Sequence, residues 1–338
     1  MIHVWEAVAE PEEPFVSCHC SVIVELDNGD LLVGYYAGEG EARPNAAWVL
    51  ARKKTDAGNF GSLQVVADTP GKPEGNGILL QNSQNELILI YGTMHGKLDG
   101  KPGPGVRWRT CDLRMKRSSD KGKTWSQVEM IDAEWGHVPR CKPIRLSTNE
   151  LVFGTEYNDG QSRIFSSMDD GKSWSVISKI PGEHNQHPTL IERKDGSLLG
   201  LLRPGGSQGF IMQSQSNDRG HSWSPAVKTG LCSPFAAIDA VKLYDNRIAL
   251  VWNDNRNARN PLTLALSEDE GVTWGCRRNL VTGEGEFHYP AIIQSEDGRI
   301  HVSFTNNRRT IDHITLDTDW IEGKGEDLRA WDEERKRE

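Results

Sequence analysis

An eight-residue pattern, Ser-x-Asp-x-Gly-x-Ser/Thr-Trp, constrains this chain more than any other feature. Its four copies occupy residues 118–125, 167–174, 216–223 and 267–274, so the tryptophan recurs every 49 to 51 residues. The Asp side chain can cap the amides of a tight turn, the Gly supplies a positive φ, and the Trp buries a large surface. An even period of this kind is typical of repeat architectures. We therefore interpret these boxes as structural and not as catalytic.

A second repeat consists of an extended segment, a polar turn and another extended segment. Six copies begin at Ser21, Gly77, Lys142, His187, Ala237 and Tyr289. Alternating or continuously apolar strands around Asn/Asp/Gly turns indicate β-hairpins. Each hairpin paired with the following, box-containing hairpin makes a four-stranded sheet. The sequence therefore predicts an all-β fold, a six-bladed β-propeller with Asp-box repeats, over residues 1–321.

The same repeat pattern predicts the structure of the two ends of the chain. The segment around Ile2 to Trp5 is expected to complete the last blade, beside Ile311 to Leu316. Residues 322–338 are mostly charged and are expected to form a solvated C-terminal tail.

Charge and motif content narrow the classes of partner. A net charge of −9 argues against nucleic acid and against an anionic membrane surface. The first residues lack a signal-peptide pattern and no stretch is long and apolar enough to span a membrane, so a cytoplasmic protein is expected. The six scattered cysteines predict free thiols. No sequence motif indicates a cofactor, so none is expected. A bound calcium or other divalent ion stays open, although no motif supports one. The oligomeric state stays open.

The topology predicts where a site would lie. In such a blade the start of the first strand and the end of the second meet on one face, while the boxes fall on the opposite face. Polar residues flanking the six hairpins should then line a funnel at the axis. The candidates at strand ends and in loops are His19, Glu41, Arg43, His95, Arg140, Glu156, His187, Arg203, Asn253, Arg256, Arg259, His288, Tyr289 and Arg308. Several arginines in one funnel favour an acidic ligand, because guanidinium matches a carboxylate bidentately.

From about Phe15 to Trp320 the chain resembles the sialidase-like family, in its "predicted neuraminidase" branch with BNR/Asp-box repeats. The boxes carry the resemblance, together with segments such as HPTLIERKDGSLLGLLR and FHYPAIIQSEDGRIHVSFTNN. It implies an exo-acting glycoside hydrolase that releases a terminal acidic sugar from an oligosaccharide or glycan. Sialidases use three arginines on the sugar carboxylate, a tyrosine nucleophile polarised by a glutamate, and an aspartate acid/base.

The resemblance implies roles for particular residues. Tyr289 matches the nucleophile, Glu156 is its candidate partner, and the arginines for the acidic group are Arg203, Arg256 and Arg308. Further substrate contacts are expected from Arg43, His95, Arg140, His187, Asn253 and His288. The acid/base position is open among Glu39, Glu41 and Asp254, with Glu41 preferred.

One departure from the family pattern bears on the substrate. Sialidases carry an Arg-Ile-Pro-like motif at the first inner strand, whereas this chain has His19 at the Arg position and no Arg-Ile-Pro at all. His19 is therefore a catalytic candidate of a different kind. The funnel also resembles propellers that act on rhamnose–glucuronate linkages as lyases or rhamnosidases, in which His19, Tyr289, Arg140 and Arg203 would serve. A non-catalytic glycan-binding or scaffold propeller is the third alternative.

Overall fold

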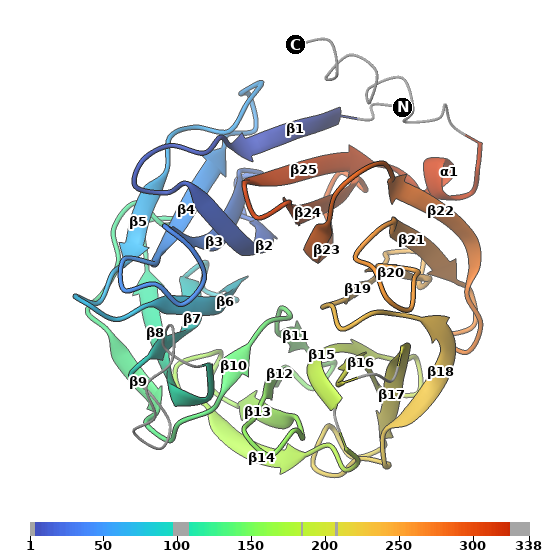
Figure 1. The fold of residues 1–338 in the computed structure, drawn as a ribbon. Coiled ribbons are helices and arrows are strands. Elements are labelled where there is room, and N and C mark those ends of the chain that lie inside the picture. The colour runs from blue at the N-terminus through green and yellow to red at the C-terminus, as the bar shows by residue number, and fades with distance from the viewer. Residues whose placement is uncertain (1–3, 97–107, 184, 207–208, 325–338) are drawn as a thin grey trace.

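The computed structural model describes residues 4–96, 108–183, 185–206 and 209–324. These residues form six antiparallel sheets arranged as blades around a central axis (Figure 1). The predicted six-bladed β-propeller is confirmed. No helix in the described ranges is long and apolar enough to cross a membrane.

Blades one to five are built from consecutive strands, and in blade three both β10 and β11 pair with β12. Blade one contains β2 (Ser17–Glu25), β3 (Leu31–Gly38), β4 (Ala47–Lys53) and β5 (Gln64–Ala67). Blade two contains β6 (Glu74–Gln81), β7 (Leu87–Met94), β8 (Cys111–Ser118) and β9 (Glu129–Asp132), with the short 3-10 helix η2 (Trp108–Thr110) before β8. Blade three contains β10 (Val138–Pro139), β11 (Ile144–Arg145), β12 (Leu151–Glu156), β13 (Arg163–Ser167) and β14 (Ser175–Lys179).

The second half of the chain repeats this arrangement. Blade four contains β15 (Asn185–Glu192), β16 (Leu198–Pro204), β17 (Phe210–Ser216) and β18 (Val227–Cys232). Blade five contains β19 (Asp239–Lys242), β20 (Ile248–Trp252), β21 (Leu262–Ser267) and β22 (Gly275–Val281). Blade six contains β23 (Phe287–Gln294), β24 (Ile300–Asn306), β25 (Thr310–Leu316) and, from the other end of the chain, β1 (Val4–Ala9).

The ring closes by pairing the two ends of the chain. Strand β1 pairs antiparallel with β25, with Val4 opposite Thr315 and Trp5 opposite Ile314. This confirms the predicted completion of the last blade, although Ile2 lies outside the described residues. Closure leaves no blade without its fourth strand, which protects sheet edges. The short helix α1 (Thr318–Ile321) follows β25; the predicted tail lies outside the described residues beyond Lys324, and the boundary at 321 stays a prediction.

Apolar side chains fill the space between neighbouring blades. In the layer between blades two and three, the Phe153 and Phe165 rings stack with centroids 5.1 Å apart. The box tryptophan Trp174 meets Phe153 edge-on at 4.9 Å and is only 8% exposed. The box Trp therefore packs between sheets, as its aromatic area favours.

The boxes connect the third and fourth strands of their blades, on the face opposite the funnel. In the box between β13 and β14, Asp169 Oδ1 accepts hydrogen bonds of 2.8 Å from the Ser167 hydroxyl and from the Ser173 amide. The Gly171 amide donates to the Ser167 hydroxyl. Gly171 has a φ of +85°, and a Cβ at this position would lie 2.6 Å from the Ile88 side chain. Asp120, Asp218 and Asp269 repeat the same contacts. The boxes are structural turns, as predicted.

Replacing Asp169 by Ala should destabilise the fold without touching the funnel. The substitution removes the charge-assisted hydrogen bonds that the carboxylate accepts from three donors. We expect the free energy of unfolding to fall by about 1–2 kcal/mol, a figure that is discounted because Asp169 is exposed. The pKa of Asp169 is lowered to about 2 because the hydrogen bonds from Ser173 and Ser167 outweigh desolvation, the largest single contribution, which raises it. The contribution is therefore present above the unfolded pKa near 4 and fades as the pH falls through about 2.

The measurement is the urea midpoint at neutral pH and again at acid pH. Asp56→Ala is the matched control, since Asp56 is exposed in the loop that joins β4 to β5. Equal midpoints for both variants would contradict the structural role of the Asp169 carboxylate.

Candidate functional site

Three inner strands carry the same irregularity at the funnel end. The ladders of β2, β15 and β23 each lose register after a polar residue: His19, Gln186 and His288. The residues that follow them have positive φ: Cys20 (64°), His187 (45°) and Tyr289 (48°). A β-bulge re-aims side chains and is favoured next to active sites. The bulges therefore turn consecutive polar residues of three blades toward the axis.

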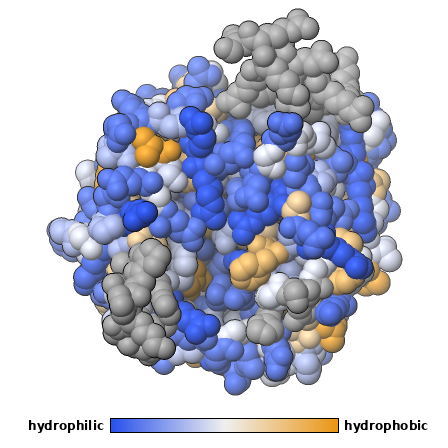
Figure 2. Space-filling model, viewed as in Figure 1, coloured by the Kyte–Doolittle hydropathy of each residue, from blue (hydrophilic) through white to orange (hydrophobic). Residues whose placement is uncertain are grey.

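The inner hairpins place a second set of polar residues opposite the bulges. Tyr36 lies opposite His19, Arg203 opposite Gln186, and Glu156 opposite Val138. Starts of first strands and ends of second strands thus meet on one face, as the topology predicted. Figure 2, viewed as Figure 1, shows mainly hydrophilic residues around the centre of the molecule.

Tyr289 lies at the centre of this cluster. Its hydroxyl accepts a 2.8 Å hydrogen bond from Arg203 Nη1, and the residue is 9% exposed. The His19 ring lies 4.4 Å from the Tyr289 ring, centroid to centroid. The guanidinium carbons of Arg140, Arg203 and Arg259 lie between 5.4 and 5.9 Å from the same centroid. Desolvation raises the pKa of Tyr289, while Arg203 opposes the rise, so the phenol is protonated at neutral pH.

Glu156 reaches Tyr289 only through other side chains. Glu156 Oε2 lies 3.1 Å from His187 Nε2, and His187 Nδ1 lies 3.3 Å from Arg203 Nη1, the donor to Tyr289. Burial lowers the pKa of His187 to about 4 although Glu156 raises it, so the imidazole is neutral at pH 7. The expected direct pairing of Glu156 with Tyr289 is therefore replaced by a chain of contacts through His187 and then Arg203. The reason is the bulge in β15, which turns His187 toward the axis beside β12.

A second carboxylate, Glu41, approaches from the loop after β3. It accepts hydrogen bonds from Arg308 Nη1 and, at 2.6 Å, from Trp108 Nε1. The Trp108 ring lies 5.9 Å from Tyr36, whose ring lies 5.7 Å from His19. Glu41 therefore joins the same cluster on the His19 side.

His288 completes the ring of histidines. Its Nδ1 lies 2.6 Å from Arg259 Nη1, and its Nε2 lies 3.0 Å from Glu286. Burial, and then Arg259 and Arg308, lower the pKa of His288 to about 3. Burial and Arg308 likewise lower the pKa of His19 well below its usual value. The histidines are neutral at pH 7, so the positive charge of the cluster lies on its guanidinium groups, and Glu41, Glu156 and Glu286 offset it in part.

Several buried polar atoms of this cluster have no hydrogen-bond partner within the described chain. They are His19 Nε2, the Tyr36 hydroxyl, Arg203 Nε, and Nε and Nη1 of Arg140. Arg140 is fully buried, and its Nη2 donates to the Pro290 carbonyl at 2.6 Å. Unpaired buried donors cost about 1–3 kcal/mol each, so they mark places that a ligand or water satisfies. Guanidinium donors select an anion.

Four predicted substrate contacts lie outside the Tyr289 cluster. His95 contacts Asp112 at 2.6 Å and Lys72 at 3.0 Å in blade two. Arg256 is exposed and lies over the Phe210 ring at 4.4 Å, and Arg43 is exposed in the loop before β4. Asn253 is buried, and its amide donates to the Pro261 and Phe287 carbonyls, which ties loops together.

The other acid/base candidates also point elsewhere. Asp254 lies 3.4 Å from Arg277, and Glu39 is exposed, with its backbone amide bonded to the Asn45 side chain. Among the three carboxylates considered from the sequence, Glu41 is the one in contact with the cluster through Arg308.

Sequence reasoning did not select two residues of the cluster. Tyr36 ends a second strand, so the rule applied to Glu156 and Arg203 would have found it. Trp108 belongs to η2, and nothing in its sequence surroundings indicates that it reaches Glu41. A cavity of about 160 Å³ lies beside the cluster and is lined by Trp108, Arg109, Gly136, Val138, Glu156 and Gln186, among others.

A family model described as "BNR repeat-like domain" matches residues 29–302. A sialidase of Bacteroides fragilis is 26% identical over 268 residues, which cover 70% of this chain and 47% of that protein. A sialidase of Micromonospora viridifaciens is 22% identical over 327 residues, which cover 85% of this chain and 49% of that protein. The chain thus spans about half the length of these curated relatives.

A solved structure shows the same fold. A Hadza microbial sialidase superimposes with a TM-score of 0.80 at 17% identity, covering 94% of this chain and 69% of that one. At this identity the likeness concerns the fold.

Proposed function

The chain belongs to the BNR repeat-like family, of the sialidase/neuraminidase-like superfamily, and on that premise we propose that it is a glycoside hydrolase that removes a terminal acidic sugar from a glycan. The observation that carries the proposal is the Tyr289 phenol, which is held 2.8 Å from Arg203 among arginines and neutral histidines. A phenol attacks an anionic sugar without the charge repulsion that a carboxylate nucleophile would meet.

The proposed chemistry proceeds in two displacements. In the first, the Tyr289 oxygen forms a bond to the anomeric carbon while the bond to the leaving oxygen breaks. Arg203 Nη1, which contacts both groups, gives a proton to Nδ1 of neutral His187 and takes up the phenolic proton, while Glu156 holds His187 at Nε2. Glu41 enters this step protonated, after Arg308 has turned from it to the substrate carboxylate, and gives its proton to the leaving oxygen. In the second, water attacks the anomeric carbon, Glu41 takes the water proton, and His187 returns a proton to Tyr289 through Arg203.

The arginines supply substrate selection in this scheme. Arg140 and Arg203 offer buried guanidinium donors that lack partners in the described chain, and Arg259 and Arg308 flank them. A guanidinium group binds a carboxylate with two parallel hydrogen bonds. Neutral His19 stands where sialidases have an arginine. In this scheme the substrate carboxylate is therefore bound by Arg140, Arg203 and Arg259. Arg308 joins them in the first displacement.

One observation favours a uronate lyase as the second candidate. His19 is neutral, its Nε2 has no partner in the described chain, and its ring lies 4.4 Å from that of Tyr289. A neutral imidazole beside a phenol can remove a proton next to a carboxylate and allow elimination of the leaving oxygen. The two reactions give different products, since elimination leaves a carbon–carbon double bond and hydrolysis does not.

The test presents a panel of glycans capped by sialic acid, by uronic acid or by neutral sugar, with products identified by mass spectrometry. We expect a hydrolytic product from acidic caps and none from neutral caps. Arg259→Ala should raise KM for the acidic substrate roughly tenfold or more, because it removes a charge-assisted contact. Arg256→Ala is the matched control, since Arg256 is exposed and lies over Phe210.

Other outcomes are informative. An unsaturated product would replace the hydrolase by the lyase, and release of rhamnose would favour a rhamnosidase. Binding of acidic glycans without any product would leave the non-catalytic glycan-binding propeller. Equal KM values for both arginine variants would contradict the assignment of Arg259 to the substrate.

A further inference from the structure

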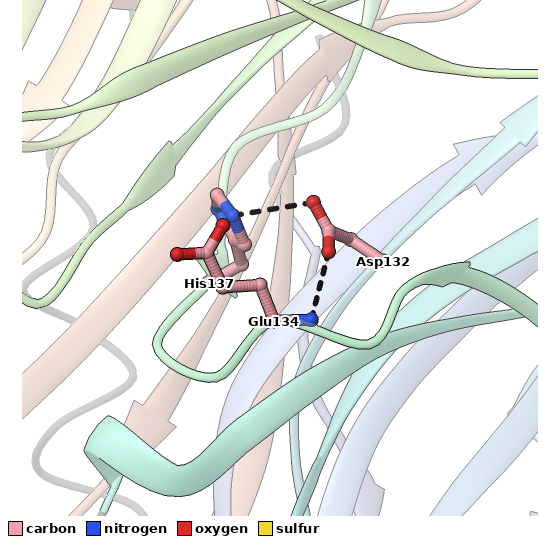
Figure 3. Close-up of side chains that lie close together, drawn as sticks. All are labelled: Asp132, Glu134 and His137. Atoms are coloured by element: carbon pink, nitrogen blue, oxygen red, sulfur yellow. Dashed lines mark hydrogen bonds and ion pairs between the residues drawn. The ribbon is translucent and has the colours of Figure 1, made fainter.

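The end of β9 and the turn that leads to β10 bring together three side chains of the kinds that bind metals, Asp132, Glu134 and His137 (Figure 3). One ligand atom from each lies within 4.8 Å of the other two. His137 Nε2 and Asp132 Oδ2 are 3.5 Å apart. Two ligands of a tetrahedral Zn²⁺, with bonds of about 2 Å, are separated by roughly 3.4 Å. The histidine and the first carboxylate already have the spacing of a shared ion.

The charge of this cluster is not balanced by a basic side chain. Within the described residues neither Asp132 nor Glu134 forms an ion pair with Lys or Arg. The nearby Arg163 is engaged by Asp159 at 2.6 Å and lies over the Tyr157 ring at 4.2 Å. Two carboxylates at this separation repel each other unless a cation lies between them. The cluster therefore has the charge that a divalent cation neutralises.

His137 is oriented as a ligand. It is 2% exposed, and its Nδ1 lies 3.1 Å from the Thr155 hydroxyl. When Nδ1 donates to that hydroxyl, Nε2 keeps its lone pair on the side of Asp132. A hydrogen bond on the second nitrogen is the usual support of a metal-bound histidine.

The second carboxylate has a similar support. The Tyr157 hydroxyl donates to Glu134 Oε1, and the Tyr157 ring packs against His137 with centroids 4.6 Å apart. The Glu134 backbone amide donates to Asp132 Oδ1 at 2.8 Å, which fixes the turn (Figure 3). Thr155 and Tyr157 stand on either side of Glu156 along the chain. The supports of the cluster are thus anchored at the end of β12.

We propose that Asp132, Glu134 and His137 bind one Zn²⁺ ion, with a water in the fourth position. Two carboxylates and one imidazole suit a transition metal of this kind better than Ca²⁺, which takes six to eight oxygen ligands. The ion fastens the turn that carries Gly136 and Val138 to the cavity beside Glu156. Its role is to hold one wall of that cavity, and the proposal stands whether or not the hydrolase is correct.

The test uses the full chain with Cys276 replaced by Ser, since that exposed thiol is a competing ligand. After treatment with a chelator and dialysis, Zn²⁺ is titrated by calorimetry and thermal unfolding is followed with and without Zn²⁺. We expect one equivalent to bind and Tm to rise. Asp132→Asn and Glu134→Gln should each weaken binding by roughly tenfold or more, since even indirect partners of a metal change affinity by that factor.

The control is Glu268→Gln, which makes the same chemical change at an exposed carboxylate in the box after β21. It should leave Zn²⁺ affinity unchanged. Circular dichroism of each variant separates loss of binding from loss of fold. Absence of saturable Zn²⁺ binding, or equal affinities for the ligand variants and the control, would overturn the proposal. Stronger binding of Ca²⁺ than of Zn²⁺ would overturn the identity of the ion.

Discussion

Replacement of Tyr289 by Phe is expected to lower kcat for hydrolysis of an acidic glycan by roughly a thousandfold or more, because it removes the atom that bonds to the anomeric carbon. The ring stays, so packing against His19 and the arginines is retained. Substrate binding should change little, because the guanidinium groups of Arg140 and Arg259 are untouched. The measurement is kcat and KM on the best substrate of the panel, with Tm as the check on folding.

The matched control for this variant is Tyr244→Phe, at a side chain that is 65% exposed in the turn between β19 and β20. It should match the wild type in both constants. His187→Gln tests the proton path: it should lower kcat and shift the acid limb of the pH profile, because the base that takes a proton through Arg203 is gone. Full activity in Tyr289→Phe would refute the nucleophile, and loss of an unsaturated product in that variant would move its role to proton transfer.

The second large expected effect is a steep loss of stability below about pH 6.5, caused by buried histidines. The pKa values of His288 and His301 are lowered to about 3 and that of His187 to about 4, in each case mainly by desolvation. Desolvation also lowers the pKa of His313. In the unfolded chain a histidine titrates near 6.5, so the unfolded state binds more protons between about pH 6.5 and 4.

Because the unfolded chain binds more protons in this range, the free energy of unfolding decreases as the pH falls. The stabilising contribution is complete above about pH 6.5 and is lost progressively as the pH falls toward the folded pKa values. Each histidine that must take up a proton on unfolding contributes up to about 1.4 kcal/mol per pH unit. Four such groups make the dependence of stability on pH several-fold steeper than one would. Denaturant unfolding at a series of pH values between about 7.5 and 4.5 measures this slope.

The pair formed by His301 and His313 offers a local test. His301 Nδ1 lies 3.0 Å from His313 Nε2, and His313 Nδ1 lies 2.9 Å from Glu6 Oε1 on β1. Both residues are buried where β1 closes the ring, so a proton on either ring disturbs the closure. His301→Gln should flatten the slope, whereas the exposed His221→Gln should not. A stability curve that is flat from about pH 7 to 4.5 would contradict the neutral, buried histidines.

Much of the fold could be predicted from the sequence because its signals are local. Each box contains its own turn: Asp169 meets donors within four residues of itself, and Gly171 supplies the positive φ. The four evenly spaced box tryptophans indicate four blades. The six inner hairpins raise the predicted number of blades to six. The pairing of β1 with β25 followed because a six-bladed ring needs a fourth strand in its last blade.

The face that holds the site was predictable for the same reason. Strand direction alternates in a meander, so the ends of the inner hairpins must share one face. His19, Arg203 and Tyr289 meet there as that rule requires. The metal-type cluster was not predicted, since Asp132 ends the short strand β9, Glu134 follows it, and no recognised motif contains them.

What the sequence determined by itself is the set of blades, the face and the polar residues available to it, because turns and strand periodicity depend on neighbours along the chain. Tertiary structure alone decided which side chains touch. A bulge of one residue turns His187 between Glu156 and Arg203, and the loop after β20 brings Arg259 to Tyr289 while Arg256 packs on Phe210. Such contacts depend on register shifts and loop paths between blades, which arise only when the ring closes.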